Sequence, residues 1–312
     1  MPSRLESRHL AAELAALDQL LASLRNEDAV GRMGLQSRRE ELYAELNRLQ
    51  QHPETAASVA LLFGGRPVVG SRGIESTFAA SVVSDFQELV TNVWATAEND
   101  QVGRRGPVPD RQRSQLHITS LLHGSVGFLL EELEDDNALF PSPLKKAAER
   151  AAQVVAAFAA DDDARFAEML ESVDQRVLST TREFLRKVHR GGATLRLVEG
   201  EHELELNDQS IVRAYERAES ASIEESEEEV RGQLLGLIPI GRRFEIQTES
   251  GDILSGIVAP TLSESYLQKL HDEQLVGKQC SGRIRRKRIL RFGRATDSVL
   301  LLDLAAVTPQ SR

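Results

Sequence analysis

The chain opens with a regular pattern of leucines that alternates steps of four and three residues. Such spacing places the leucines along one side of an α-helix. A second series follows a segment with two glycines and stops before Pro53. The two series are Leu10, Leu14, Leu17, Leu21 and Leu24, then Leu35, Leu42, Leu46 and Leu49. We predict a helical hairpin, similar to a coiled coil, over residues 1–53, packed on the body of the protein or on a second copy.

Residues 54–219 mix strand-like and helix-like patterns, which predicts a central α+β domain. Apolar runs at 57–63 and 67–70 flank Gly64-Gly65 and predict a β-hairpin. Apolar residues at steps of three and four then predict a core helix from Phe78 to Trp94. Further along, the patterns predict a hairpin over 116–133, helices over 141–158 and 161–192, a hairpin around 199–200, and a short helix over 208–218.

The last part of the chain changes to short strands after an acidic run at 220–228, which we interpret as a linker. Strands are predicted at 229–238, 242–248, 252–259, 278–291 and 298–306, with a helix from Leu262 to Leu270. This order, β-β-β-α-β-β, resembles an OB-fold and predicts a small β-barrel over residues 229–312. An SH3-like or other small barrel is a close alternative. We therefore expect an α+β multidomain protein.

Composition narrows the class of protein. The chain has 312 residues, enough for two or three domains that each bury a core. Cys280 is the only cysteine, which excludes a disulfide within the chain and a cysteine-based zinc site. No apolar run approaches the roughly 20 residues that span a bilayer. We expect a cytoplasmic protein with no membrane contact, no metal site and no cofactor.

One segment reverses the charge of the chain around it. The formal net charge is −10, yet residues 277–294 hold eight Lys or Arg and no acid. A local positive segment of this kind predicts contact with a polyanion or with an acidic protein. The candidate polyanion-binding residues are Arg283, Arg285, Arg286, Lys287, Arg288, Arg291 and Arg294.

Nucleic acid and protein partners are both open for this segment. Phosphate contacts by Lys and Arg need no particular base, so a basic barrel strand fits sequence-tolerant nucleic-acid binding. The barrel has few aromatic residues for base stacking, namely Phe244, Tyr266 and Phe292. Two structural interpretations compete with binding. In one, the basic strand guards a sheet edge against aggregation; in the other, it pairs with the chain's own acidic residues Glu224 to Glu229.

Three arginines in the central domain are candidates for anion binding. The glycines of residues 64–73 precede a helix, so backbone amides near Arg72 could hold an anion with its help. Arg104 and Arg105, in the loop after the core helix, suit the same chemistry. Turn formation by the glycines, and a solvated loop, are the competing interpretations.

His117 and His123 lie on or near one predicted hairpin, and a group of carboxylates follows shortly after. Those carboxylates are Glu131, Glu132, Glu134, Asp135 and Asp136. A catalytic site needs its groups to converge in space, and the sequence shows only that they are close along the chain. We therefore assign no catalytic residue.

We expect a non-enzymatic regulatory or scaffolding protein that self-associates and binds a partner through its basic C-terminal barrel. The leucine series and the lack of a complete catalytic motif motivate this expectation. The alternatives are a sequence-tolerant nucleic-acid-binding protein, and a hydrolase or nucleotide-processing enzyme that uses the central domain.

Overall fold

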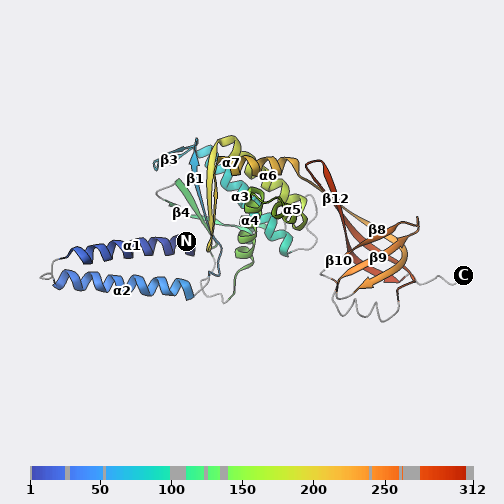
Figure 1. Cartoon of the computed structure of the whole chain (residues 1–312), viewed down its shortest axis with the longest axis horizontal. Helices are drawn as coiled ribbons and strands as arrows, with labels where there is room; N and C mark the ends of the chain where they lie inside the picture. The colour runs from blue at the N-terminus through green and yellow to red at the C-terminus, as the bar shows by residue number, and fades with distance from the viewer. Residues whose placement is uncertain are drawn as a thin grey trace. The chain divides into compact units, whose positions relative to one another are not determined.

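The computed structural model divides the chain into two compact units, residues 1–219 and 220–312. The first unit contains a pair of helices and a mixed body of helices and strands, and the second contains a β-barrel (Figure 1). The expected mixture of α and β structure is therefore confirmed, as are the N-terminal helical pair and the small barrel. The described residues are 2–24, 29–51, 54–98, 110–122, 126–133, 140–238, 241–259, 262 and 275–306.

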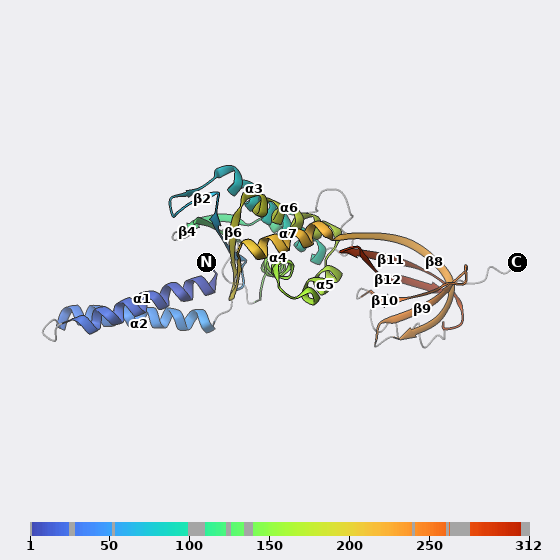
Figure 2. The ribbon, with the colours of Figure 1, turned by 45° about the horizontal axis from the view of Figure 1, so that its top comes forward.

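Helices α1 (Ser3–Ser23) and α2 (Ala29–Gln51) lie side by side as a hairpin (Figures 1 and 2). Their leucines face each other, with Leu10, Leu14, Leu17 and Leu42 buried between the helices. Two ion pairs join the helices beside these leucines: Arg38–Glu13 at 3.1 Å and Arg39–Asp18 at 2.7 Å. The two leucine series thus bury each other within one chain, which removes the need for a second copy at this seam.

Five antiparallel strands form the sheet of the first unit, in the order β4-β5-β1-β6-β7. Their bounds are β1 (Ser58–Gly65), β4 (His117–Leu122), β5 (Val126–Glu131), β6 (Ala193–Glu199) and β7 (His202–Leu206). The hairpins predicted over 116–133 and around 199–200 are present as β4–β5 and β6–β7.

The hairpin predicted around Gly64-Gly65 is wrong. Strand β1 is the central strand of the sheet and pairs with β5 and β6 instead. Its first six residues are all buried, as expected for a strand covered on both faces. The next short strand, β2 (Val68–Val69), pairs with β3 (Gly73–Ile74) in a separate small hairpin.

The central helix of the first unit is α3 (Ser76–Glu98), the predicted core helix. The others are η1 (Arg111–Ser114), α4 (Pro143–Ala159), α5 (Asp163–Ser172), α6 (Gln175–Gly191) and α7 (Asp208–Ser220). Helix α3 packs on α4 and α6. The single helix predicted over 161–192 is in fact α5 and α6, because the Asp174 side chain accepts a hydrogen bond from the Val177 amide and starts a new helix.

The second unit is a closed barrel with the strand order β10-β12-β11-β8-β9. Its strands are β8 (Ser222–Ile238), β9 (Arg243–Thr248), β10 (Ile253–Val258), β11 (Gln279–Arg291) and β12 (Arg294–Ala306). The β10–β12 pair is parallel and the other four pairs are antiparallel. Phe244, Ile246 and Ile284 are fully or almost fully buried in its core.

The structure differs from one expectation for the barrel, and a second expectation falls mostly outside the described residues. The acidic run at 220–228, interpreted as a linker, lies mostly in β8, which begins at Ser222 and pairs along its length with the basic strand β11. The helix predicted from Leu262 to Leu270 lies outside the described residues, apart from Leu262 itself. None of the helices that the structure describes is long and apolar enough to cross a membrane.

Candidate functional site

The basic segment forms β11, which lies between β8 and β12 in the barrel. Both of its backbone edges are therefore hydrogen-bonded to neighbouring strands. The interpretation of this strand as an edge guard is wrong, because β11 has no open edge over the paired residues. Its alternative, pairing with the chain's own acids, describes the structure.

Acidic residues of β8 stand opposite basic residues of β11 at four positions. These pairs are Arg283 with Glu229, Arg285 with Glu227, Lys287 with Glu225, and Arg288 with Glu224. Side-chain ion pairs form between directly opposite residues, Arg285–Glu227 at 2.7 Å, and diagonally, Arg286–Glu228 at 2.7 Å. Toward β12, Arg283 pairs with Asp303 at 2.6 Å. We call residues 224–229 of β8 and 283–288 of β11 the charge ladder.

The charge ladder cancels the positive charge that makes this segment conspicuous in the sequence. Strands β8, β11 and β12 together carry eight basic and seven acidic residues, so this part of the barrel is close to neutral. Burial alone would raise the pKa of Asp303, but hydrogen bonds from the Arg283 side chain and amide outweigh it and lower that pKa. Arg291 and Arg294 lie outside the ladder, opposite each other across the β11–β12 turn.

The carboxylates near His117 serve to hold the fold together. Glu131 accepts hydrogen bonds from the hydroxyls of Ser58 and Thr119. Glu132 accepts one from the Ala57 amide at 2.8 Å and one from Ser142, the residue that caps α4. His117 is exposed at the start of β4, and His123, Glu134, Asp135 and Asp136 lie outside the described residues. Among the described residues, no group of His, Cys, Asp and Glu is placed to hold a metal ion.

Strand β4 has an exposed backbone edge. Within the described part of the chain it pairs with β5 alone, so none of the described strands covers its other backbone edge. Its first five residues are exposed, including Ile118 at 57% and Leu121 at 61%. Its sequence, HITSLL, contains no Lys, Asp or Glu. The opposite edge strand, β7, carries the exposed Glu205, a charge of the kind that usually discourages pairing.

A cavity of about 820 Å³ lies between α3 and strands β4 and β5. Leu121, Phe128 and Leu130 of the sheet line it, and they face the small side chains Ala79 and Ala80 of α3. Arg72 and Arg111 also line the cavity. The candidate Arg72 thus belongs to a cavity wall, whereas Arg104 and Arg105 lie outside the described residues.

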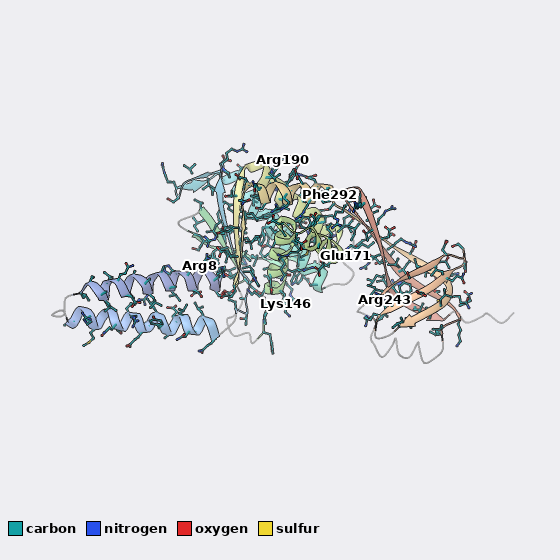
Figure 3. The ribbon with its side chains drawn as sticks, viewed as in Figure 1. Arg8, Lys146, Glu171, Arg190, Arg243 and Phe292 are labelled. Carbon is teal, nitrogen blue, oxygen red and sulfur yellow. The ribbon has the colours of Figure 1, made fainter. Side chains whose placement is uncertain are left out.

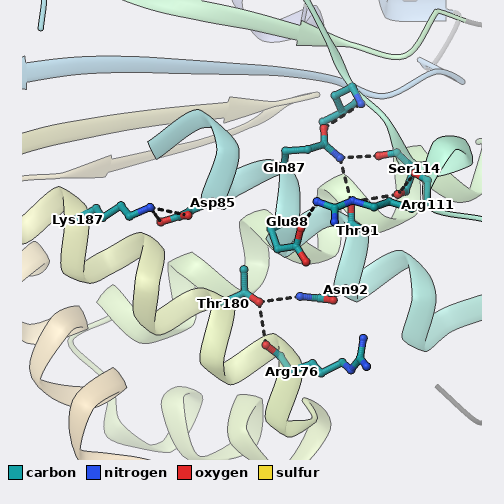
Figure 4. A network of polar contacts seen from close by, with 11 residues as sticks. Asp85, Gln87, Glu88, Thr91, Asn92, Arg111, Ser114, Arg176, Thr180 and Lys187 are labelled. Atoms are coloured by element: carbon teal, nitrogen blue, oxygen red, sulfur yellow. Dashed lines mark hydrogen bonds and ion pairs between the residues drawn. The ribbon is translucent and has the colours of Figure 1, made fainter. Parts of the chain in front are cut away.

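Gln87 of α3 fixes the wall of this cavity. Its Nε2 donates to the Ser114 carbonyl at 2.7 Å, and its Oε1 accepts from the Leu116 amide at 2.9 Å (Figure 4). Arg111 pairs with Glu88, one residue further along α3 (Figure 4). These contacts join η1 and the start of β4 to α3, so this side of the cavity is preformed.

A buried ionic cluster lies elsewhere in the first unit. Lys145 of α4 pairs with Glu199, whose side chain is 2% exposed, and with Glu54 at 3.1 Å. Burial alone would lower the pKa of Lys145, but the two carboxylates raise it, so the ammonium group stays charged. Because every charge in the cluster has a partner, its arrangement serves to join α4 to the end of β6.

Sequence patterns did not reveal the cavity or the exposed edge of β4. The adjacent alanines of α3 were the available signal for the cavity, because small residues on a core helix leave space beside it. For β4, the signal was a predicted strand without charged residues.

No family model, no curated protein and no solved structure matches this chain. Function is therefore inferred from the geometry alone.

Proposed function

We propose that this protein is a non-enzymatic scaffolding protein that pairs with a second copy of itself through the exposed edge of β4. The observation that carries the proposal is the contrast between the two edges of the sheet. Strand β7 presents the exposed carboxylate of Glu205, while β4 presents backbone groups beside apolar side chains. An uncharged, exposed edge is a template for strand addition.

Antiparallel pairing of β4 with its copy fits two-fold symmetry. In such an interface the same surface serves both partners, and each residue meets its symmetry-related counterpart. The pairing would extend two five-stranded sheets into one continuous sheet. A strand of six residues provides a small interface, so we expect a dissociation constant in the micromolar range. The dimer would carry two copies of the barrel, as a scaffold requires.

Sedimentation velocity of the full chain at about 50 µM tests this proposal, since a micromolar dimer is populated at that concentration. We expect the wild type to be a dimer and Ser120→Lys to be a monomer, because a charge on the edge must be desolvated on pairing. His202→Lys, which adds the same charge to the opposite edge strand, is the matched control and should remain a dimer. A monomeric wild type, or a Ser120→Lys dimer with an unchanged circular dichroism spectrum, would overturn the proposal.

We further propose that the barrel is OB-like and the helical pair a short coiled coil. Numbered along the barrel, the strands close in the order 1-2-3-5-4, and the parallel pairing of the third with the fifth supports an OB-like connection. The facing leucines of α1 and α2 support the coiled coil. Cys280, buried and unpaired, suits a reducing compartment such as the cytoplasm.

The proposed role of the barrel is to contact a protein partner. Nucleic acid is the alternative partner, and the charge ladder makes it the weaker one, because arginines that already pair with carboxylates release few counterions from phosphates. The salt series described in the Discussion separates the two.

A further inference from the structure

We infer that the cavity between α3 and strands β4 and β5 binds a small amphipathic anion, with an apolar body and one carboxylate or phosphate group. The cavity shares strand β4 with the edge pairing proposed above, but it uses side chains of that strand, whereas the pairing uses its backbone edge. Its volume, about 820 Å³, lies within the roughly 300–1,000 Å³ typical of small-molecule sites.

The apolar part of the ligand is indicated by the deep lining of the cavity. Leu130 is 2% exposed and Ala79 is 6% exposed, so the inner wall is hydrocarbon. Ile118 and Leu121, at 57% and 61% exposed, line the same cavity. Apolar surface left open to water beside a preformed cavity gains free energy when an apolar ligand covers it.

The anionic group is indicated by the charges at the cavity wall. Arg111 is already paired with Glu88. Arg72 has no ion pair among the described residues, so it is the cation left to bind a ligand. Among the described residues, no Asp or Glu lines the cavity, which favours an anion over a cation there.

Helix α3 adds to the same preference. Helix α3 runs along the cavity wall from Ser76, its first residue, to Gln87, so the positive end of the helix dipole lies at one end of this wall. Arg72 lies four residues earlier in the chain. Together they supply the positive charge on one wall, while the sheet supplies the apolar wall. An anion with an apolar tail complements both the positive wall and the apolar wall. A cation or a purely polar anion complements one wall at most.

Dodecanoate is a suitable probe because it combines a carboxylate with an apolar chain. Isothermal titration of the full chain, below the micelle threshold of each probe, compares dodecanoate with dodecyltrimethylammonium and with acetate. We expect saturable binding of dodecanoate only. Equal binding of the cationic probe, or no binding of dodecanoate at millimolar concentration, would overturn the inference.

Two variants locate the binding. Arg72→Gln should weaken dodecanoate binding about tenfold, the loss expected for one charge-assisted contact. Arg190→Gln, in the last turn of α6 (Figure 3), removes an exposed charge that does not line the cavity and should leave binding unchanged. Ala80→Phe places a ring at an exposed helix position that lines the cavity, and it should abolish binding while the helix content stays the same. Unchanged affinity in Arg72→Gln, or in Ala80→Phe, would show that dodecanoate binds elsewhere and would overturn the assignment.

The two proposals fail independently. Ser120 does not line the cavity, and Ala80 is not part of β4. Loss of the dimer in Ser120→Lys therefore leaves the ligand test valid, and loss of binding in Ala80→Phe leaves the edge test valid.

Discussion

Glu203 is surrounded by three arginines: Arg4 and Arg8 of α1 and Arg196 of β6. Partial burial alone would raise the pKa of its carboxyl, but the hydrogen bonds from Arg4 and Arg8, with the charge of Arg196, lower that pKa to about 2. The carboxylate therefore holds α1 against the sheet. A second contact, from the Arg4 amide to the Gly200 carbonyl at 3.2 Å, lies beside it.

We expect Glu203→Gln to lower the free energy of unfolding at pH 7 by about 1–2 kcal/mol, because the arginines are exposed and partly screened. A pKa lowered from 4.5 to about 2 stabilises the fold above pH 4.5 and loses that effect as the pH falls toward 2. The difference between wild type and variant should therefore shrink between pH 5 and pH 3. Urea unfolding at each pH measures it. Glu205→Gln, an exposed carboxylate on the same strand, is the control and should show no such trend.

Lys145 makes a different prediction, because its partner Glu199 is almost completely buried. Lys145→Met should cost about 3–5 kcal/mol, since it leaves the Glu199 carboxylate without its ammonium partner. The double variant Lys145→Met with Glu199→Met removes both charges and should be more stable than the single variant. Urea unfolding of the two proteins tests this, and a double variant less stable than the single one would contradict it.

At the scale of the elements, most helices and strands could be predicted from the pattern of apolar residues. The core helix α3 and the β4–β5 hairpin were predicted from periodicity and turns alone. Strand β1 was mispaired, because a short run of buried residues indicates a strand without indicating its neighbours. The break between α5 and α6 was missed because Asp174 acts as a helix cap in a segment whose apolar spacing continues.

The acidic strand β8 shows the limit of composition as a guide. A run of glutamates is typical of a solvated linker, and Glu224 to Glu229 were predicted to be one. They form a strand because the basic residues of β11 lie opposite them and offset the repulsion between so many carboxylates. The sequence contains both complementary runs, some 60 residues apart. Only the register between β8 and β11 shows that the two runs pair, and composition does not reveal it.

A charge exchange tests the ladder. Arg285→Glu places two carboxylates opposite each other at the Glu227 position and should destabilise the barrel by about 1 kcal/mol. Adding Glu227→Arg restores an opposite-charge pair and should recover most of the loss. The midpoint of urea unfolding measures both. Arg243→Glu, on β9 outside the ladder, is the matched reversal for which no recovery by Glu227→Arg is expected.

At the scale of the whole molecule, the distribution of charge gives a test that separates nucleic acid from protein as the proposed partner. The chain carries a net charge of −10, and its basic strand is neutralised by its own acids. We expect no saturable binding of single-stranded or duplex DNA or RNA at about 100 µM protein and physiological salt. Fluorescence anisotropy across a salt series measures this.

The same titration includes a variant with alanine at Arg285, Arg286, Lys287 and Arg288. We expect this variant to lose barrel stability, because it leaves the acids of β8 unpaired. Wild-type binding that falls steeply with salt and disappears in a folded variant would instead restore the polyanion interface.

The candidate sites were less predictable than the fold. Arg72 was identified as a candidate from the glycines near it, but its place in a cavity depends on strands more than 40 residues further along the chain. The exposed edge of β4 depends on sheet order, which apolar patterns do not determine. Both features arise from contacts between distant segments.

The charge ladder also constrains how this protein can change during evolution. A substitution at Glu227 or Glu228 removes the ion pair that this residue makes with Arg285 or Arg286, and the reverse holds for the two arginines. A charge reversal at one member of a pair therefore brings like charges together, while a matched change in its partner restores the attraction. Among descendants of this chain, positions 227 and 285, and positions 228 and 286, should vary together, so the two strands are inherited as one unit.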